Sequence, residues 1–177
     1  MSSSIHLDAQ GLFEILTEEE TSLLHPDYFG LRLEEEFKKS WRYGWAYTLI
    51  VFEIEGIEAI RAKDGDVAYR GLLLAVAGEI LNASRDIDLS TRQEDGRFVV
   101  LLPGCDREGA EAFVKRVLTD NVLERAQGRF TLSVGGTCSP DPQMDSVDEF
   151  VARADTAVSR AREMGPNRFV VWNQASA

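Results

Sequence analysis

Residue types that build metal centres, disulfides and membrane spans are scarce in this sequence. It has two cysteines and two histidines among 177 residues, and Cys105 and Cys138 lack the spacing of a zinc site. We expect both thiols to pack as small apolar groups in a reducing compartment. No apolar run approaches the roughly 20 residues of a membrane helix, and residues 1–11 lack the apolar core of a signal peptide. These absences predict a cytoplasmic chain with no membrane contact, no metal and no cofactor.

Basic residues are also outnumbered. The chain carries 19 Lys and Arg against 30 Asp and Glu, for a formal net charge of −11. A surface of this charge repels nucleic acid and anionic lipid at long range, so neither is an expected partner. A ligand that bears phosphate would have to be held by a local cluster of arginines.

Length and composition predict a single domain. A chain of 177 residues, 44% of them hydrophobic, can bury one sizeable core and is short for two. We expect residues 1–19 to form an N-terminal extension, with a short helix from Gly11 to Leu24, and residues 20–177 to form the folded domain.

The stretch Arg85–Gly104 carries the strongest local signal, which is that of a β-hairpin. Asp95-Gly96 tolerates the positive φ of a type I′ turn. The apolar run Phe98–Leu102 that follows is typical of a strand buried on both faces. We therefore expect this hairpin to lie at the centre of a sheet.

The other elements follow from apolar periodicity and from capping residues. Asp106 is a candidate N-cap, and Ser146 with Glu149 forms a capping box. Gly65 interrupts one helical stretch, and Gly135-Gly136 is expected to close a strand. The predicted helices are 27–41, 56–63, 69–83, 107–118 and 147–161, and the predicted strands beside the hairpin are 47–54, 128–134 and 169–172.

This order of elements predicts the fold class. It is an α/β (α+β) sandwich with a mixed, mostly antiparallel central sheet flanked by helices, ferredoxin-like or nucleotide-cyclase-like, in the order βααββαβαβ.

Several local strings, in this order and at these separations, resemble the GGDEF domain of bacterial diguanylate cyclases, which condense two GTP into cyclic di-GMP. The resemblance extends from about Glu20 to Trp172. The matching strings are Thr21-Ser22-Leu23 with Tyr28-Phe29, Val51–Glu55, Phe98–Pro103, Leu132–Gly136, Ala154–Ala157, Arg160-Ala161-Arg162, Gly165 and Asn167-Arg168.

The chain departs from the family pattern at the hairpin that names the family. There it reads Glu94-Asp95-Gly96-Arg97-Phe98, so only the Phe is kept in register. The resemblance implies that backbone N–H groups beside two glycines approach a triphosphate, whereas Glu94 and Asp95 bring negative side chains. An acidic metal ligand of the family falls on Gly96 and its acidic neighbour on Arg97.

Other substrate positions of the family are altered as well. The Asp that ends the first strand is replaced by the longer Glu53, and Mg²⁺ requires near-ideal octahedral geometry. The guanine-reading residues fall on Arg61 and Arg70, which offer no acceptor for guanine N–H groups. A phosphate-contacting cation is kept in charge as Arg162. We therefore predict a degenerate domain that has no catalytic residue and is not an enzyme. A turn shifted by one residue could still let Asp95 act as the metal ligand.

One site of the family is retained in this sequence. The resemblance implies an inhibitory RxxD motif, five residues ahead of the hairpin motif, which binds cyclic di-GMP. Arg85 and Asp88 stand at that separation from Glu94, and a further arginine of the site falls on Arg116. Arginine forks suit guanine edges and phosphates, and Asp88 can accept from guanine N1–H and N2–H₂. The motif is short and recurs at Arg61 with Asp64 and at Arg92 with Asp95, so a solvated charge corner is the alternative.

Three function classes follow. The first is a bacterial signal-transduction receptor that binds cyclic di-GMP through Arg85, Asp88 and Arg116 and passes the signal to a protein partner, with a homodimer linked by the ligand. The second is a ligand-free interaction module. The third is a domain with residual diguanylate cyclase activity or GTP binding.

Overall fold

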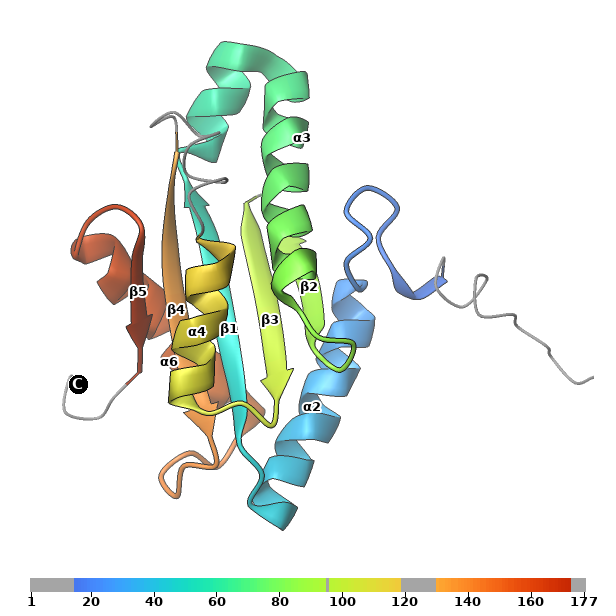
Figure 1. The fold of residues 1–177 in the computed structure, drawn as a ribbon, viewed down its shortest axis with the longest axis vertical. Helices are drawn as coiled ribbons and strands as arrows, with labels where there is room; N and C mark the ends of the chain where they lie inside the picture. The colour runs from blue at the N-terminus through green and yellow to red at the C-terminus, as the bar shows by residue number, and fades with distance from the viewer. Residues whose placement is uncertain (1–14, 95, 119–129, 173–177) are drawn as a thin grey trace, which may run out of the picture.

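The computed structural model describes residues 15–94, 96–118 and 130–172. Within them, helices and strands alternate along the chain except at β2 and β3, which follow each other directly (Figure 1). The helices are α2 (Pro26–Tyr43), α3 (Ile57–Ala83), α4 (Arg107–Val117) and α6 (Val147–Glu163), and the strands are β1 (Tyr47–Glu55), β2 (Leu89–Glu94), β3 (Arg97–Pro103), β4 (Thr131–Ser139) and β5 (Arg168–Val171).

The strands form one sheet in the order β2-β3-β1-β4-β5. The β2–β3, β3–β1 and β1–β4 pairs are antiparallel and the β4–β5 pair is parallel. The predicted fold class, a mixed and mostly antiparallel sheet flanked by helices, is therefore confirmed.

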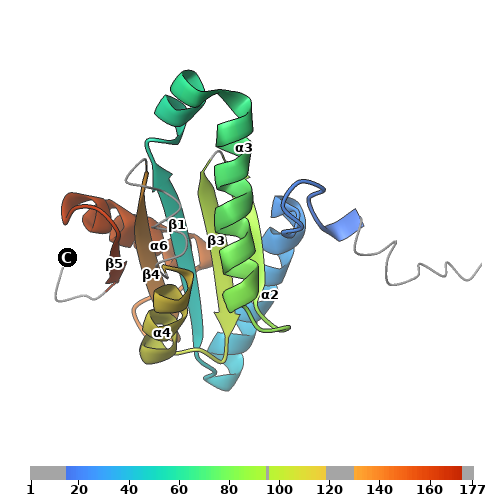
Figure 2. The same cartoon turned by 45° about the horizontal axis from the view of Figure 1, so that its top comes forward.

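Side chains that alternate along β1 build a core on each face of the sheet. Ile50, Phe52 and Ile54 pack with residues of α3 and α4 in one cluster. Leu49 and Val51 pack with residues of α2 and α6 in the other. Figures 1 and 2 show α3 and α4 on the face toward the viewer and α2 and α6 behind the sheet. Because strand residues point to opposite faces in turn, an unbroken apolar run serves both cores.

Several local predictions are confirmed. Asp106 caps α4 by accepting from the Gly109 amide at 2.9 Å, and Ser146 caps α6 by accepting from the Glu149 amide at 3.3 Å. Gly65 has a φ of 83°, outside the helical region, and breaks the run of α3 into two helical parts. These signals are local, so they could be found from sequence.

Three predictions need correction. The hairpin is not central: β2 is an edge strand, because its residues Leu89–Glu94 are largely polar, and β1 holds the centre. Strand β4 does not close at Gly135-Gly136 but continues to Ser139, since both glycines pair with β1. The helix expected over Gly11–Leu24 lies partly outside the described residues, and Thr17 and Leu24 form a β-bridge instead.

Within the described residues, no helix combines the length and apolarity that crossing a membrane requires.

Gly135 is required by the packing of α6 on β4. A Cβ atom at this position would lie 2.3 Å from the Val158 amide nitrogen and 2.5 Å from the Ala154 carbonyl oxygen. Both are backbone atoms, so the helix as a whole would have to move. At Gly136 the closest atom to such a Cβ is a ring carbon of Phe169, at 3.3 Å.

We therefore expect Gly135→Ala to lower the free energy of unfolding by about 3 kcal/mol, the upper part of the range for overpacked cores. Gly136→Ala is the matched control and should lower it by less than about 1 kcal/mol, because a side-chain ring can adjust. Urea unfolding followed by circular dichroism measures both. Equal losses in the two variants would contradict the packing account.

Candidate functional site

A cavity of about 350 Å³ opens between helix α4 and the turn that follows α3. We call it the α3–α4 pocket. All three residues predicted to bind cyclic di-GMP line it, although Arg116 is about 30 residues away in sequence from the other two. Its lining residues are Ala46, Arg85, Asp88, Leu102, Gly104, Cys105, Asp106, Gly109, Ala112, Phe113 and Arg116.

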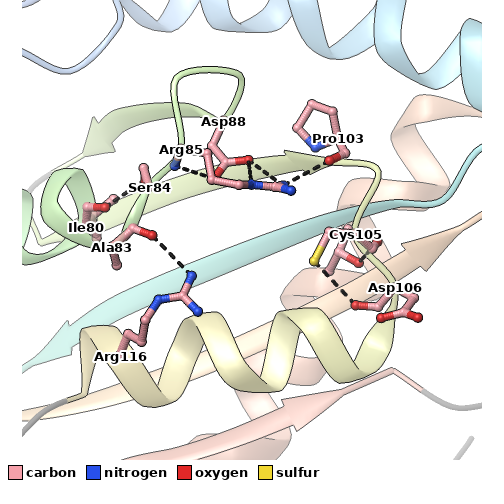
Figure 3. Close-up of polar contacts among 10 residues, drawn as sticks. Ile80, Ala83, Ser84, Arg85, Asp88, Pro103, Cys105, Asp106 and Arg116 are labelled. Carbon is pink, nitrogen blue, oxygen red and sulfur yellow. Dashed lines mark hydrogen bonds and ion pairs between the residues drawn. The ribbon is translucent and has the colours of Figure 1, made fainter.

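Arg85 and Asp88 form a tight pair on one side of this pocket (Figure 3). The Arg85 guanidinium donates to the Asp88 carboxylate from Nη2 at 2.8 Å and from Nε at 3.2 Å. The Arg85 amide also donates to Asp88 at 2.8 Å, and the Asp88 amide donates to the Arg85 carbonyl oxygen at 3.0 Å. The turn itself therefore fixes the spacing of the two side chains.

The two members of the pair differ in exposure. The Asp88 side chain is 1% exposed, whereas the Arg85 side chain is 49% exposed. A further bond from Arg85 Nη2 to the Pro103 carbonyl oxygen, 2.9 Å long, ties the turn to the end of β3. The hydrogen bond with Asp88 is the main reason that the pKa of Arg85 is raised above its ordinary value. Arg85 thus covers Asp88 and presents its own charge to the pocket.

Arg116 lies on α4 on the opposite side of the same pocket (Figure 3). Its guanidinium donates to the carbonyl oxygen of Ala83, the last residue of α3, at 3.2 Å, and lies 5.6 Å from the centre of the Phe113 ring. Among the described residues, its guanidinium has no carboxylate partner. The pocket therefore holds two arginines, of which one is neutralised by an acid.

Two glycines and a cysteine are among the residues that line the α3–α4 pocket. Gly104 has a φ of 64°, which favours glycine, and a Cβ at Gly109 would lie 2.7 Å from the Cys105 sulfur. The Cys105 side chain is almost fully buried, and burial raises the pKa of its thiol. Cys105 and Cys138 are both unpaired thiols, in agreement with the expected packing role.

A second pocket of about 450 Å³ lies at the start of β3, beside the hairpin. We call it the hairpin pocket. Its lining residues are Glu53, Ile54, Glu55, Gln93, Gly96, Arg97 and Arg162. Four of the eight altered family positions named above, namely Glu53, Gly96, Arg97 and Arg162, therefore lie together in this pocket.

The carboxylates of the hairpin pocket are paired with arginines. Glu53 accepts from both Arg97 and Arg162, and Arg97 also donates to Asp155 on α6. Arg162 Nε donates to Glu55 at 2.7 Å, which is the main cause of the raised pKa of Arg162. Among the described residues, no group of three or more acidic, histidine or cysteine side chains is arranged to hold a metal ion. The side chains in this arrangement do not fit the divalent cation that the family resemblance implies.

The remaining altered positions lie elsewhere or cannot be placed. Arg61 donates to Asp66 at 2.9 Å and its guanidinium lies 4.7 Å from the Tyr69 ring centre, while Arg70 is 3.7 Å from Glu20. Neither lines the hairpin pocket. The backbone of Glu94 pairs with Arg97, and Asp95 lies outside the described residues.

The two other RxxD copies have different surroundings. Arg61 pairs with Asp66 on its own helix, and Arg92 pairs with Glu18 at 2.7 Å and holds the N-terminal segment against β2. Sequence reasoning missed the bond from Arg85 to the Pro103 carbonyl oxygen and the place of Phe113 in the lining of the α3–α4 pocket, since a backbone carbonyl and a helix face leave no motif. It also missed the contact of Asp155 with Arg97, although Asp155 lies in the matched string Ala154–Ala157.

Comparisons with known proteins agree with this fold. The model of the family described as "Diguanylate cyclase, GGDEF domain" matches residues 18–168. The chain therefore belongs to the GGDEF domain family. It is 28% identical over 173 residues to the diguanylate cyclase DgcP of Pseudomonas aeruginosa, an alignment that covers 94% of this chain and 25% of that protein. The chain spans 25–30% of the length of the curated relatives that it matches.

Solved structures share the architecture. The coiled coil and GGDEF domain of DgcB from Caulobacter crescentus, solved in complex with c-di-GMP, matches with a TM-score of 0.80 and 18% identity over 92% of this chain and 88% of that one. The diguanylate cyclase SiaD of Pseudomonas aeruginosa, solved with its activator SiaC, matches with a TM-score of 0.77 and 24% identity over 88% of this chain and 61% of that one. At these identities the likeness shows the fold.

The prediction that the chain is not an enzyme is wrong. The family to which it belongs is an enzyme family, and the curated relatives are named diguanylate cyclases. The prediction relied on a few altered positions, several of them in the hairpin pocket. The family match extends over residues 18–168 and overrides that argument.

Proposed function

We propose that this domain binds cyclic di-GMP in the α3–α4 pocket and acts as a receptor that passes the signal to a protein partner. The observation that carries the proposal is that Arg85, Asp88 and Arg116 line one pocket in a chain whose net charge is −11. In such a chain two arginines beside one cavity are the local cluster that a phosphate-bearing ligand requires.

Ligand binding requires one local rearrangement. Because Asp88 is covered by Arg85, a guanine can reach the carboxylate only after the half-exposed Arg85 side chain moves away from it. The guanine N1–H and N2–H₂ groups then replace the guanidinium as donors to Asp88, and Arg85 turns its fork to the guanine edge or a phosphate. Arg116 supplies the second cation by leaving the Ala83 carbonyl oxygen.

The descriptions of two similar proteins support the proposal of cyclic di-GMP as the ligand and of a protein as the partner. The GGDEF domain of DgcB is described as a complex with c-di-GMP, and SiaD as a complex with an activator protein. A receptor domain that responds to the same dinucleotide and contacts another protein fits both descriptions.

Calorimetric titration tests the proposal against its alternatives. We expect the unmodified chain to bind cyclic di-GMP, and Arg85→Ala to weaken binding about 30-fold or more, since truncating one side of a buried charged contact costs about 2 kcal/mol or more. Asp88→Ala should cause a similar loss, and Arg116→Ala should weaken binding in the same direction.

Arg61→Ala is the matched control, because it disrupts another RxxD copy at an exposed ion pair and should change affinity by less than about threefold. Equal losses at Arg61 and Arg85 would show that the α3–α4 pocket is not the site. Binding of neither cyclic di-GMP nor GTP would favour the ligand-free interaction module, and heat released only by GTP would favour nucleotide turnover.

The ligand should also link two copies of the chain. Two stacked cyclic di-GMP molecules have two-fold symmetry, so Arg85 and Asp88 of one copy and Arg116 of a second copy can share them in a closed pair. Light scattering at saturating cyclic di-GMP should give twice the mass found without ligand, and Arg116→Ala should reduce that dimer. An unchanged mass would contradict the linked dimer while leaving binding within one chain intact.

A further inference from the structure

The guanidinium of Arg97 lies at the centre of the charged cluster in the hairpin pocket. Its Nε donates to the Gln93 side-chain oxygen at 3.1 Å, its Nη1 to Glu53 and its Nη2 to Asp155. Each nitrogen of the group therefore has a separate acceptor. The Arg97 side chain is 19% exposed and the Glu53 side chain 23% exposed, so the contact between these two is largely shielded from water.

Glu53 is the acid that joins this arginine to a second one. One of its oxygens accepts from Arg97 and the other from Arg162, which also donates to Glu55. The cluster thus connects β1, β3 and α6. Three carboxylates and two guanidiniums leave it with a formal charge of −1, from three negative and two positive groups.

The two arginines hold carboxylates from different elements together and cancel their repulsion. A divalent cation in an acidic pocket does the same. An arginine guanidinium keeps its charge at all relevant pH values and donates hydrogen bonds to carboxylates from a fixed planar arrangement of N–H groups. We infer that Arg97 takes the place of the divalent cation in the hairpin pocket, so that the pocket is assembled without metal and any divalent cation has to displace this side chain to reach Glu53.

The position of Arg97 in the sequence agrees with the inference. It follows Gly96, whose φ of 78° forms the turn, and it pairs in register with Glu53 across the β1–β3 ladder. Side chains of directly opposed residues lie about 5 Å apart, so the pairing register itself delivers the guanidinium to this carboxylate.

Removal of the Arg97 charge should therefore create affinity for a divalent cation. Arg97→Gln keeps a side chain that can donate to Asp155 or Glu53 but leaves three carboxylates against the single guanidinium of Arg162. Calorimetric titration with Mn²⁺, without nucleotide, should show at least about tenfold tighter binding in Arg97→Gln than in the unmodified chain, because one unit of repulsion at close range is removed.

Arg107→Gln is the matched control, since it makes the same change in net charge at an exposed pair with Glu111 near the other end of the sheet. It should leave Mn²⁺ affinity within about threefold of the unmodified chain. Tightening of equal size in both variants would overturn the inference, because it would reflect the overall charge. Equally tight Mn²⁺ binding by the unmodified chain and by Arg97→Gln would overturn it as well.

The unmodified chain supplies a second measurement if Arg97→Gln does not fold. A cation that binds only the folded chain raises its melting temperature. We expect the melting temperature to be the same in excess Mg²⁺, in excess Mn²⁺ and in EDTA, because Arg97 already occupies the place of the cation. A rise with either metal that is abolished by Glu53→Gln would contradict the inference.

Discussion

The burial of β1 on both faces and both edges is the constraint on which the rest of the structure depends. Its ladder with β4 uses the full strand and its ladder with β3 runs from Tyr47 to Glu53, and its side chains enter the α3–α4 core and the α2–α6 core in turn. A strand without an exposed edge or face cannot shift its register by one residue without turning every side chain to the wrong core. The positions of the polar residues at its two ends are fixed as a result.

Those two ends carry the two pockets. Ala46, just before β1, lines the α3–α4 pocket, and Glu53 near its other end lines the hairpin pocket, about 23 Å away at about 3.3 Å per residue. The helices beside the two pockets differ as well, because Leu102 of the α3–α4 pocket packs with α3 and α4 whereas Arg162 of the hairpin pocket belongs to α6. In the α3–α4 pocket, Arg85 is paired with an acid and Arg116 contacts only a backbone carbonyl oxygen and an aromatic ring. In the hairpin pocket, both arginines are paired with acids.

Features of the fold that depend on neighbouring residues were predicted well from the sequence, and features that depend on distant segments were predicted less well. The caps at Asp106 and Ser146 and the break at Gly65 depend on neighbouring residues, so they could be found. The central place of β1 depends on pairing between distant segments, which an apolar run at Phe98–Leu102 does not reveal. For the same reason the RxxD spacing predicted Arg85 and Asp88 together, but neither the cover that Arg85 forms over Asp88 nor the contact of Arg97 with Asp155 could be foreseen.

Amide NMR spectra recorded as cyclic di-GMP is added to the isotope-labelled chain test the central claim most directly, because they locate the ligand without any substitution. Binding in the α3–α4 pocket predicts shifts at residues 83–88 and 104–116, where the backbone surrounds Arg85 and Arg116. Residues 53–55, 96–97 and 162 at the hairpin pocket should keep their positions. Shifts confined to the hairpin pocket, or none at saturating ligand, would contradict the account.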